Sequence, residues 1–250
     1  MVEISSIPTA ASLTVRQADA WRPDLVSGEV PHGEVFAAGN EGAGAGLALA
    51  LALDRMAARS SDGPSADAQE DRMWLWVQDR EALRRSGRPY LPGLPRALRH
   101  RLVHVSARSA EDALFALEEG LRCRDFAFVV GEVTGNPRAL DFTASRRLSL
   151  AAERHGVPLW LVRLDAKADL SSARMRWRAQ SCASPQPRWN PQAPGVPSWQ
   201  AELFRARRHP PGTWVLRDDG RLVAERAGGI AAIAPSRFSS HHAQPVEARG

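Results

Sequence analysis

The chain of 250 residues has very little of several residue types: one lysine, one tyrosine and two cysteines. Cys123 and Cys182 show no pairing pattern and no metal-site spacing, which excludes a disulfide framework and is typical of a reducing cytoplasm. The longest apolar run, residues 46–53, is too short to cross a bilayer. Residues 1–13 lack the features of a signal peptide. The sequence therefore predicts a cytoplasmic protein that does not use a membrane.

The positive charge of the chain is carried almost wholly by arginine. The formal net charge is +5, which favours an anionic partner such as nucleic acid. A basic surface without any nucleic-acid role has the same composition, so both interpretations stay open. A hydrophobic fraction of 44% is sufficient for a packed core and excludes global disorder.

The only lysine, Lys167, lies far in sequence from the one segment that resembles a phosphate-binding loop. That segment, residues 39–46, contains Gly39, Gly42, Gly44, Ala45 and Gly46, and it separates an apolar run from a helix-like stretch. A working loop needs a lysine for the outer phosphates and a Ser or Thr hydroxyl for magnesium. Ala45 and Gly46 stand at those positions. The pattern predicts a nucleotide loop that has lost its chemistry, with no cofactor.

Two interpretations of this degenerate loop remain. Glycine-rich turns between a strand and a helix point backbone N–H groups outward, so the loop could still hold an anion weakly. Alternatively, it is a relic that only turns the chain, because without the lysine the main charge on a phosphate is missing.

The order of apolar segments predicts an α/β fold. Strands are expected at residues 34–38, 73–77, 102–105, 126–130 and 157–162, and helices at 47–59, 110–122 and 143–155. Ser109 is the expected N-cap of the second helix, and the third helix is expected to bury Leu148 and Leu150. Loops are expected between the second and third strands and at residues 185–197, and Trp177 is interpreted as a core residue.

Later segments around Met175, Leu203 and Trp214 alternate with period two, which indicates antiparallel strands. The prediction is a mostly parallel sheet flanked by helices with a C-terminal antiparallel extension. The expected domain organisation is an N-terminal arm or helix (1–24), one core (25–230) and a disordered tail (231–250).

Residues 20–225 resemble the RecA core in the order of their elements. Residues 39–46 align with the family's nucleotide loop, and residues 128–132 with its magnesium-binding strand. In that strand Gly131 stands where the family has an aspartate, and Glu132 comes one residue late. Gln78, Asp79 and Glu81 lie near the position of the water-activating glutamate. The resemblance implies a RecA-like, P-loop-type core without the groups needed for hydrolysis.

More specifically, six segments together resemble the ImuA family. They are residues 81–90 (EALRRSGRPY), 113–119 (ALFALEE), 140–153 (LDFTASRRLSLAAE), 174–178 (RMRWR), 202–207 (ELFRAR) and 211–214 (PGTW). The resemblance implies a non-catalytic adaptor in SOS-induced mutagenic translesion synthesis. Its implied partners are an ImuB-type pseudo-polymerase and an error-prone replicative-type polymerase, with RecA, single-stranded DNA and self-association as further expectations.

Three alternatives compete with the adaptor interpretation. A SulA-type cell-division inhibitor shares the ancestry, but such chains are usually shorter. A DNA-binding RecA paralogue would use the basic surface directly. A divergent ATPase would need a substitute for the missing lysine, for which Arg80 is a candidate.

Arginines in three segments are the candidate contacts to a partner or to DNA. They are Arg146, Arg147, Arg174, Arg176, Arg178, Arg205, Arg207 and Arg208. If the strands that carry the last six are neighbours, these residues form one basic face of the sheet. A solvated helix face and an ordinary half-exposed strand explain the same pattern. The sequence contains no catalytic triad pattern and no histidine spacing for a metal.

Overall fold

A computed structural model describes residues 32–61, 71–207, 209–218 and 222–226 of the chain. The expected N-terminal arm (1–24), the expected tail (231–250) and Arg208 lie outside these residues, as do residues 25–31 at the start of the expected core. Among the helices in these ranges, none is both long enough and apolar enough to cross a membrane.

The described chain folds into strands and helices that alternate in its first two thirds. The strands are β1 His32–Ala37, β2 Met73–Gln78, β3 Leu102–Ser106, β4 Phe126–Thr134, β5 Leu159–Leu164, β6 Met175–Ser181, β7 Ser198–Ala206, β8 Gly212–Asp218 and β9 Leu222–Arg226. The helices are α2 Ala43–Ser61, α3 Arg80–Ser86, α4 Arg96–Arg99, α5 Ala110–Arg122 and α6 Phe142–His155, with a 3-10 turn at Leu91–Gly93.

The strands form one nine-stranded sheet in the order β3-β2-β4-β5-β1-β6-β7-β8-β9. Strands β1 to β6 pair in parallel, and β7, β8 and β9 continue the sheet in antiparallel pairs. The mixed α/β fold with a C-terminal antiparallel part is therefore confirmed. One detail differs, because β6 is antiparallel only to β7 and joins the parallel part through β1.

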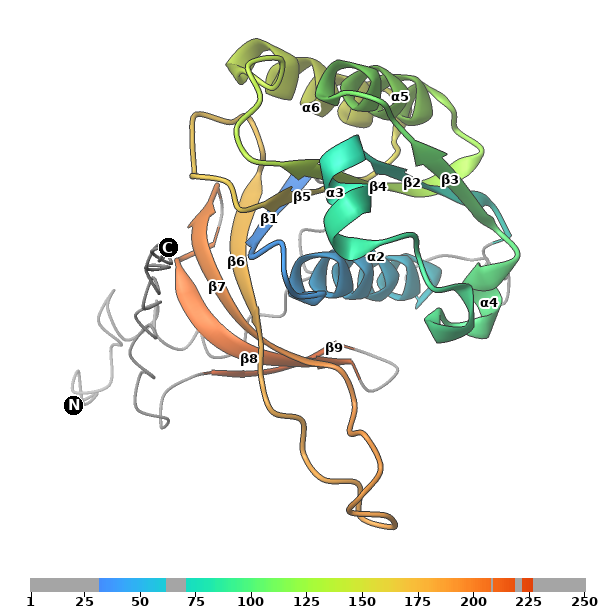
Figure 1. Cartoon of the computed structure of the whole chain (residues 1–250), viewed down its shortest axis with the longest axis vertical. Coiled ribbons are helices and arrows are strands. Elements are labelled where there is room, and N and C mark those ends of the chain that lie inside the picture. The colour runs from blue at the N-terminus through green and yellow to red at the C-terminus, as the bar shows by residue number, and fades with distance from the viewer. Residues whose placement is uncertain (1–31, 62–70, 208, 219–221, 227–250) are drawn as a thin grey trace, which may run out of the picture.

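Helices cover both faces of the parallel sheet. Helices α5 and α6 lie on one face and α2 on the other, and the antiparallel strands curve round α2 (Figure 1). Alternation along β2 serves both faces: Leu75 and Val77 belong to the core under α5 and α6, and Trp74 and Trp76 to the core against α2. At the far edge, Leu222 of β9 donates its N–H to Asp54 of α2 (3.1 Å).

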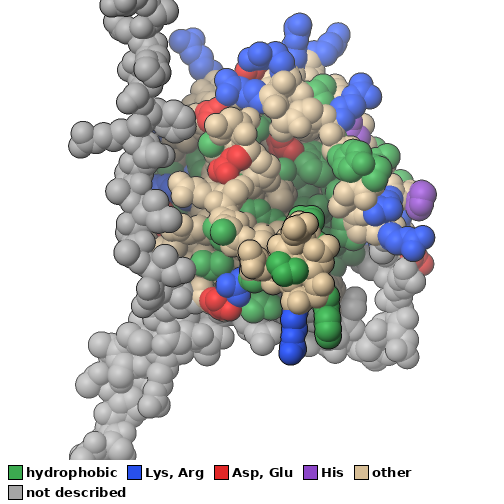
Figure 2. Space-filling view, turned by 60° about the horizontal axis from the view of Figure 1, so that its bottom comes forward, with side chains coloured by type: hydrophobic (Ala, Val, Ile, Leu, Met, Phe, Trp, Pro, Cys, Tyr) green, Lys and Arg blue, Asp and Glu red, His purple; other side chains and the backbone are tan. Residues whose placement is uncertain are grey.

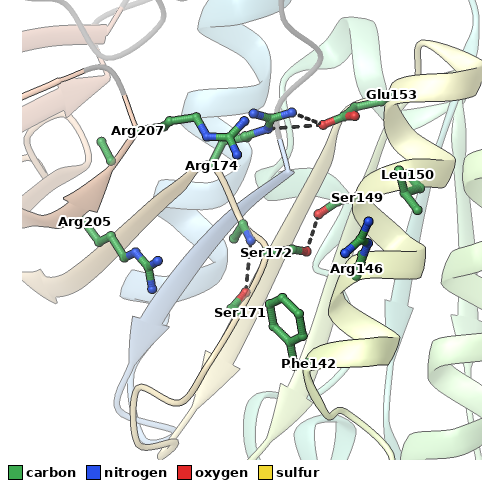
Figure 3. A pocket seen from close by; sticks show the side chains of 12 residues that line it. Phe142, Arg146, Ser149, Leu150, Glu153, Ser171, Ser172, Arg174, Arg205 and Arg207 are labelled. Atoms are coloured by element: carbon green, nitrogen blue, oxygen red, sulfur yellow. Dashed lines mark hydrogen bonds and ion pairs between the residues drawn. The ribbon is translucent and has the colours of Figure 1, made fainter.

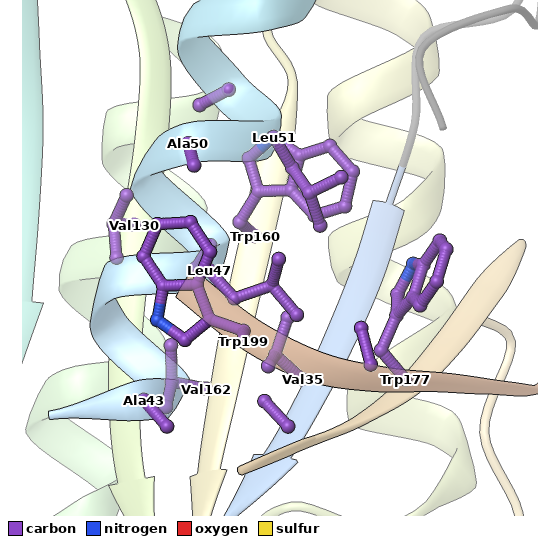
Figure 4. Packing of buried hydrophobic residues seen from close by; sticks show 14 of the residues in the cluster. Val35, Ala43, Leu47, Ala50, Leu51, Val130, Trp160, Val162, Trp177 and Trp199 are labelled. Atoms are coloured by element: carbon purple, nitrogen blue, oxygen red, sulfur yellow. The ribbon is translucent and has the colours of Figure 1, made fainter. Parts of the chain in front are cut away.

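The core against α2 is rich in tryptophan. It contains Trp74, Trp76, Trp160, Trp177, Trp199 and Trp214, all buried. Figure 4 shows Trp160, Trp177 and Trp199 in this core together with Leu47 and Leu51 of α2. The interpretation of Trp177 as a core residue is confirmed, since it is fully buried.

Capping residues fix the two helices on the opposite face. Ser109 accepts a hydrogen bond from the N–H of Asp112 and begins α5, as predicted, and Asp141 does the same for α6 through Ala144. Helix α6 ends at Gly156, whose φ of 74° is left-handed. The prediction that this helix buries Leu150 is wrong: Leu148 is buried, but Leu150 is 53% exposed.

The long connection between β6 and β7, residues 182–197, is a loop as its prolines predicted, and it projects from the lower part of the molecule in Figure 1. It carries Trp189, whose side chain is 92% exposed, with the guanidinium of Arg188 5.8 Å from its ring centre. Figure 2 views the molecule with this lower part forward, and basic side chains are concentrated along the upper rim of that view.

Candidate functional site

The candidate site is a groove of about 570 Å³ between α6 and the start of β6 with the end of β7. We call it the arginine groove; it is lined by Phe142, Arg146, Ser149, Leu150, Glu153, Ser171, Ser172, Ala173, Arg174, Arg205, Ala206 and Arg207. Four of the arginines singled out from the sequence thus face one space, although they come from three separate segments (Figure 3).

Helix periodicity and strand pairing bring these residues together. Phe142, Arg146 and Leu150 are spaced four residues apart and therefore share one face of α6. On the opposite wall, β6 and β7 pair with Met175 opposite Ala206, and the N–H of Arg207 donates to the carbonyl of Arg174 (3.1 Å). Neighbouring strands thus place Arg174, Arg205 and Arg207 at one end of the sheet extension.

The four guanidinium groups of the groove are not equivalent. Within the described part of the chain, Arg146, Arg205 and Arg207 are exposed and their guanidinium groups have no hydrogen-bond or ion-pair partner. Arg174 is half-buried and pairs with Glu153 of α6, and its Nη1 atom is buried without a partner. One carboxylate therefore faces four cations in the groove.

The expectation that Arg176 contacts a partner needs correction. Its side chain is only 3% exposed, and its Nε donates to Glu34 of β1 (2.7 Å). The guanidinium also lies 5.0 Å from the ring centre of Phe36 and donates to the carbonyl of Asp169 (2.7 Å). Burial next to a carboxylate makes this arginine part of the core instead of the surface.

Arg147 and Arg178 lie outside the groove. Arg147 is exposed on α6 and pairs with Glu118 of α5 (3.4 Å). Arg178 pairs with Glu202 of β7 (2.9 Å) and lies over the ring of Phe204. The single basic sheet face expected from the sequence is therefore split into a buried arginine, a paired exposed one and the arginine groove.

A chain of hydrogen-bonded hydroxyl groups forms the floor of the groove. It runs from His32 Nδ1 to Ser149 Oγ (2.7 Å), to Ser172 Oγ (2.6 Å), to Ser145 Oγ (3.1 Å), to Ser171 Oγ (2.9 Å) and to Glu34 Oε1 (2.7 Å). The floor is therefore polar, and it connects the groove to the buried ion pair of Glu34 and Arg176. Sequence reasoning missed this chain because its members are scattered over β1, α6 and the segment before β6.

Burial controls the protonation of His32. The side chain is 1% exposed, and burial lowers its pKa to about 4, with the positive charges of Arg176 and Arg163 acting in the same direction. The carboxylates of Glu34 and Glu153 oppose this shift without reversing it. The imidazole is therefore neutral at physiological pH, and it serves as a hydrogen-bond partner rather than as a charge.

The degenerate glycine loop forms a close turn into α2. The helix begins at Ala43, earlier than predicted, so that Gly44, Ala45 and Gly46 are helical. The N–H of Gly39 donates to Asp165 Oδ1 (2.9 Å), and Arg85 Nη1 donates to Asp165 Oδ2 (2.6 Å). The N–H of Gly39, the first donor of the turn, is therefore already bonded to the carboxylate of Asp165.

Two of the loop glycines are closely packed. A Cβ at Gly44 would lie 2.8 Å from Val162 Cγ1 and 2.9 Å from Ala37 Cβ, and one at Gly46 would lie 3.1 Å from the ring of Trp199. Position 44 requires glycine because α2 approaches two strands closely there, whereas a methyl group at position 46 would need only a small shift of the Trp199 ring. Close packing of α2 on the sheet thus gives a structural reason for glycine in this loop, in line with the interpretation that the loop only turns the chain.

Replacing Gly44 with alanine is expected to destabilise the fold by about 1–3 kcal/mol, because the methyl group overlaps rigid neighbours on two strands. Gly42→Ala is the matched control in the same loop, since a Cβ there meets no atom within 4 Å. Urea unfolding of both variants measures the difference. Equal stability of the two variants would show that packing does not explain the glycine at position 44.

The acidic candidates beside the expected nucleotide site are held by other groups. Asp79 caps α3 through the N–H of Ala82 (2.7 Å) and also accepts the N–H of Thr134 (2.9 Å). Hydrogen bonds from Arg84 and Arg85 lower the pKa of Glu81 to about 2. Asp79 is thus held by two backbone N–H groups, and the lowered pKa of Glu81 is far from that of a general base.

Glu132 and Gln78 lie side by side at the ends of β4 and β2. Glu132 accepts hydrogen bonds from Trp76 Nε1 (2.7 Å), Gln78 Nε2 (3.2 Å) and Ser86 Oγ (3.1 Å), while burial raises its pKa. Both oxygens of this carboxyl group are used by protein donors. In the described residues, no group of three or more His, Cys, Asp or Glu side chains is arranged to hold a metal ion.

Fold and site together define a mixed α/β protein with a closed glycine turn and a separate basic groove. No protein-family model matches the chain. Protein ImuA of Caulobacter vibrioides, from strain NA1000 / CB15N and from strain ATCC 19089 / CIP 103742 / CB 15, is 36% identical over 154 residues. The match covers 57% of this chain and 59% of the length of those relatives, so the similarity to ImuA spans little more than half of each chain.

Proposed function

We propose that this chain is a non-catalytic accessory protein of mutagenic translesion DNA synthesis that acts by binding an ImuB-type pseudo-polymerase. The similarity to ImuA supports a place in this damage-response system. An error-prone replicative-type polymerase and RecA are the further partners that the resemblance implies. The position of β1, between β5 and β6 and followed directly by the glycine turn and α2, supports a RecA-like core.

The observation that carries the non-catalytic part of this proposal is the glycine turn. Ala45 and Gly46 replace the lysine and the hydroxyl of a working loop, Asp165 occupies the N–H of Gly39, and Trp199 lies against Gly46. A nucleotide phosphate would meet a carboxylate here, and the loop itself supplies no lysine. The turn therefore favours a protein that works by binding.

The test combines two measurements on the full chain. Co-expression with ImuB of the same organism should give a complex that survives gel filtration without added nucleotide. Phosphate release from ATP should stay at the level of the buffer, with and without ImuB. Failure to form the complex would contradict the adaptor role, and ATP turnover that co-elutes with the protein would contradict the non-catalytic role.

A further inference from the structure

We propose that the arginine groove binds the phosphodiester backbone of a single nucleic-acid strand. This inference is independent of the proposal that the chain binds ImuB. It rests on the guanidinium groups of Arg146, Arg205 and Arg207, which face one groove from two walls and have no partner in the described residues. Guanidinium groups match phosphate oxygens in charge and in planar, two-pronged geometry.

The α6 wall combines charge with apolar surface. Phe142 is 47% and Leu150 is 53% exposed, and Arg146 lies between them on the same helix face. At 1.5 Å per residue this wall extends over about 12 Å, which accommodates a short stretch of extended strand. Proteins that bind single strands combine a basic groove for the backbone with exposed aromatic rings on which bases stack. Phe142 supplies such a ring.

The floor of the groove argues against an acidic peptide as the ligand. A peptide that binds in a groove usually buries apolar side chains in apolar pockets. Here Ser149, Ser171 and Ser172 line the floor, and their hydroxyl groups belong to one hydrogen-bonded chain. Apolar side chains of a bound peptide that reached the floor would lie against these hydroxyl groups, which is unfavourable. Phosphate oxygens are polar and can lie beside hydroxyl groups. The lining therefore fits a phosphate backbone better.

Glu153 is the one carboxylate in the groove, and it makes the proposal sharply testable. It pairs with Arg174, so it neutralises one cation and repels an anionic ligand. Removing its charge should release Arg174 for a further phosphate contact, because Nε and Nη2 of that arginine would no longer be paired with a carboxylate. Most substitutions in a binding site weaken binding, so a gain of affinity from one neutralised carboxylate would support this arrangement.

The experiment measures binding of a labelled oligothymidine to the full chain over a range of salt concentrations. The variant Arg146→Gln/Arg205→Gln should bind at least about tenfold more weakly, and its salt slope should fall by about 1.4, or about 0.7 for each lost contact. Glu153→Gln should bind about threefold more tightly or better, because it frees one more cation.

The matched control is Arg147→Gln/Arg178→Gln, which removes the same charge from α6 and from the sheet extension but outside the groove. It should change affinity by less than about twofold at equal salt. Equal weakening by the two double variants would overturn the proposal, as would unchanged or weaker binding by Glu153→Gln. Thermal unfolding of each variant checks that it is folded.

Two competitors separate the ligand classes. A duplex of the same length that binds as tightly as the single strand would overturn the single-strand assignment. A polyglutamate peptide that displaces the labelled strand better than the unlabelled strand does would overturn the nucleic-acid assignment in favour of an acidic protein segment. Capture of ImuB by the same variants should be unchanged, so that failure of this proposal and failure of the adaptor proposal give different results.

Discussion

Replacing Glu34 with glutamine should lower the free energy of unfolding by about 3–5 kcal/mol, because it leaves Arg176 buried without its counter-charge. Glu34 is fully buried, and its Oε2 accepts from Arg176 Nε at 2.7 Å. Arg163, also buried, lies 3.8 Å from the other carboxylate oxygen. Asp169 is the only other carboxylate paired with both arginines in the described residues, at 3.5 and 3.6 Å, and it is partly exposed. Urea unfolding at neutral pH measures the loss.

The control replaces both partners with apolar residues. Glu34→Leu/Arg176→Met keeps the volume and removes both charges, so most of the stability should return. Arg176 packs against the rings of Phe36 and Phe204, which gives a methionine an apolar environment. A double variant as unstable as Glu34→Gln would show that the uncompensated charge of Arg176 is not the cause, since Arg163 keeps its charge in both variants.

Acidification should destabilise the protein by about 2 kcal/mol between pH 7 and pH 5, and by about 3 kcal/mol by pH 4, through His32 alone. The pKa of this side chain falls from 6.5 to about 4 on folding, because burial disfavours the charged form. The unfolded chain therefore binds a proton over this range and the folded chain does not. The stability is fully present above pH 6.5 and is lost as the pH falls towards 4.

The matched variant is His32→Gln, whose amide can keep a hydrogen bond to Ser149 but does not titrate. The difference between parent and variant, measured by urea unfolding at each pH, isolates the histidine. Glu132 acts in the opposite direction, since its raised pKa means that stability falls as the pH rises above 4.5, but this contribution cancels in the comparison. Parallel curves for parent and variant would contradict the prediction.

The fold could be predicted from local patterns because parallel strands and amphipathic helices have distinct periodicities. Errors arose where periodicity was misapplied or a short element was overlooked. Residues two apart on a helix lie on different faces, so Leu148 and Leu150 cannot both face the sheet, and Leu150 is exposed. Helix α3 was taken for a turn and loop, although Asp79 before it and Gly87 after it, with a φ of 73°, are ordinary signals for its two ends.

The site could be predicted only in part, because its members are joined by long-range pairing. The sequence indicated which arginines to consider. It did not indicate that Glu34 of β1 lies directly beside Arg176 of β6, or that α6 faces the end of β7 across a groove. Period-two alternation assigns a side chain to a face of the sheet, but whether that face is buried depends on strands and helices far away in the sequence.

Tryptophan is placed unevenly in this protein, so the two cores on the two faces of the sheet differ in intrinsic fluorescence. All six buried indole rings of the described chain belong to the core against α2, and none to the core beneath α5 and α6. The fluorescence of these six rings therefore reports on one core, whereas far-ultraviolet circular dichroism reports on the backbone around both. Unfolding curves from the two signals will coincide only if the two cores melt as one cooperative unit. Comparing the two unfolding curves therefore tests whether the cores on the two faces of the sheet unfold together.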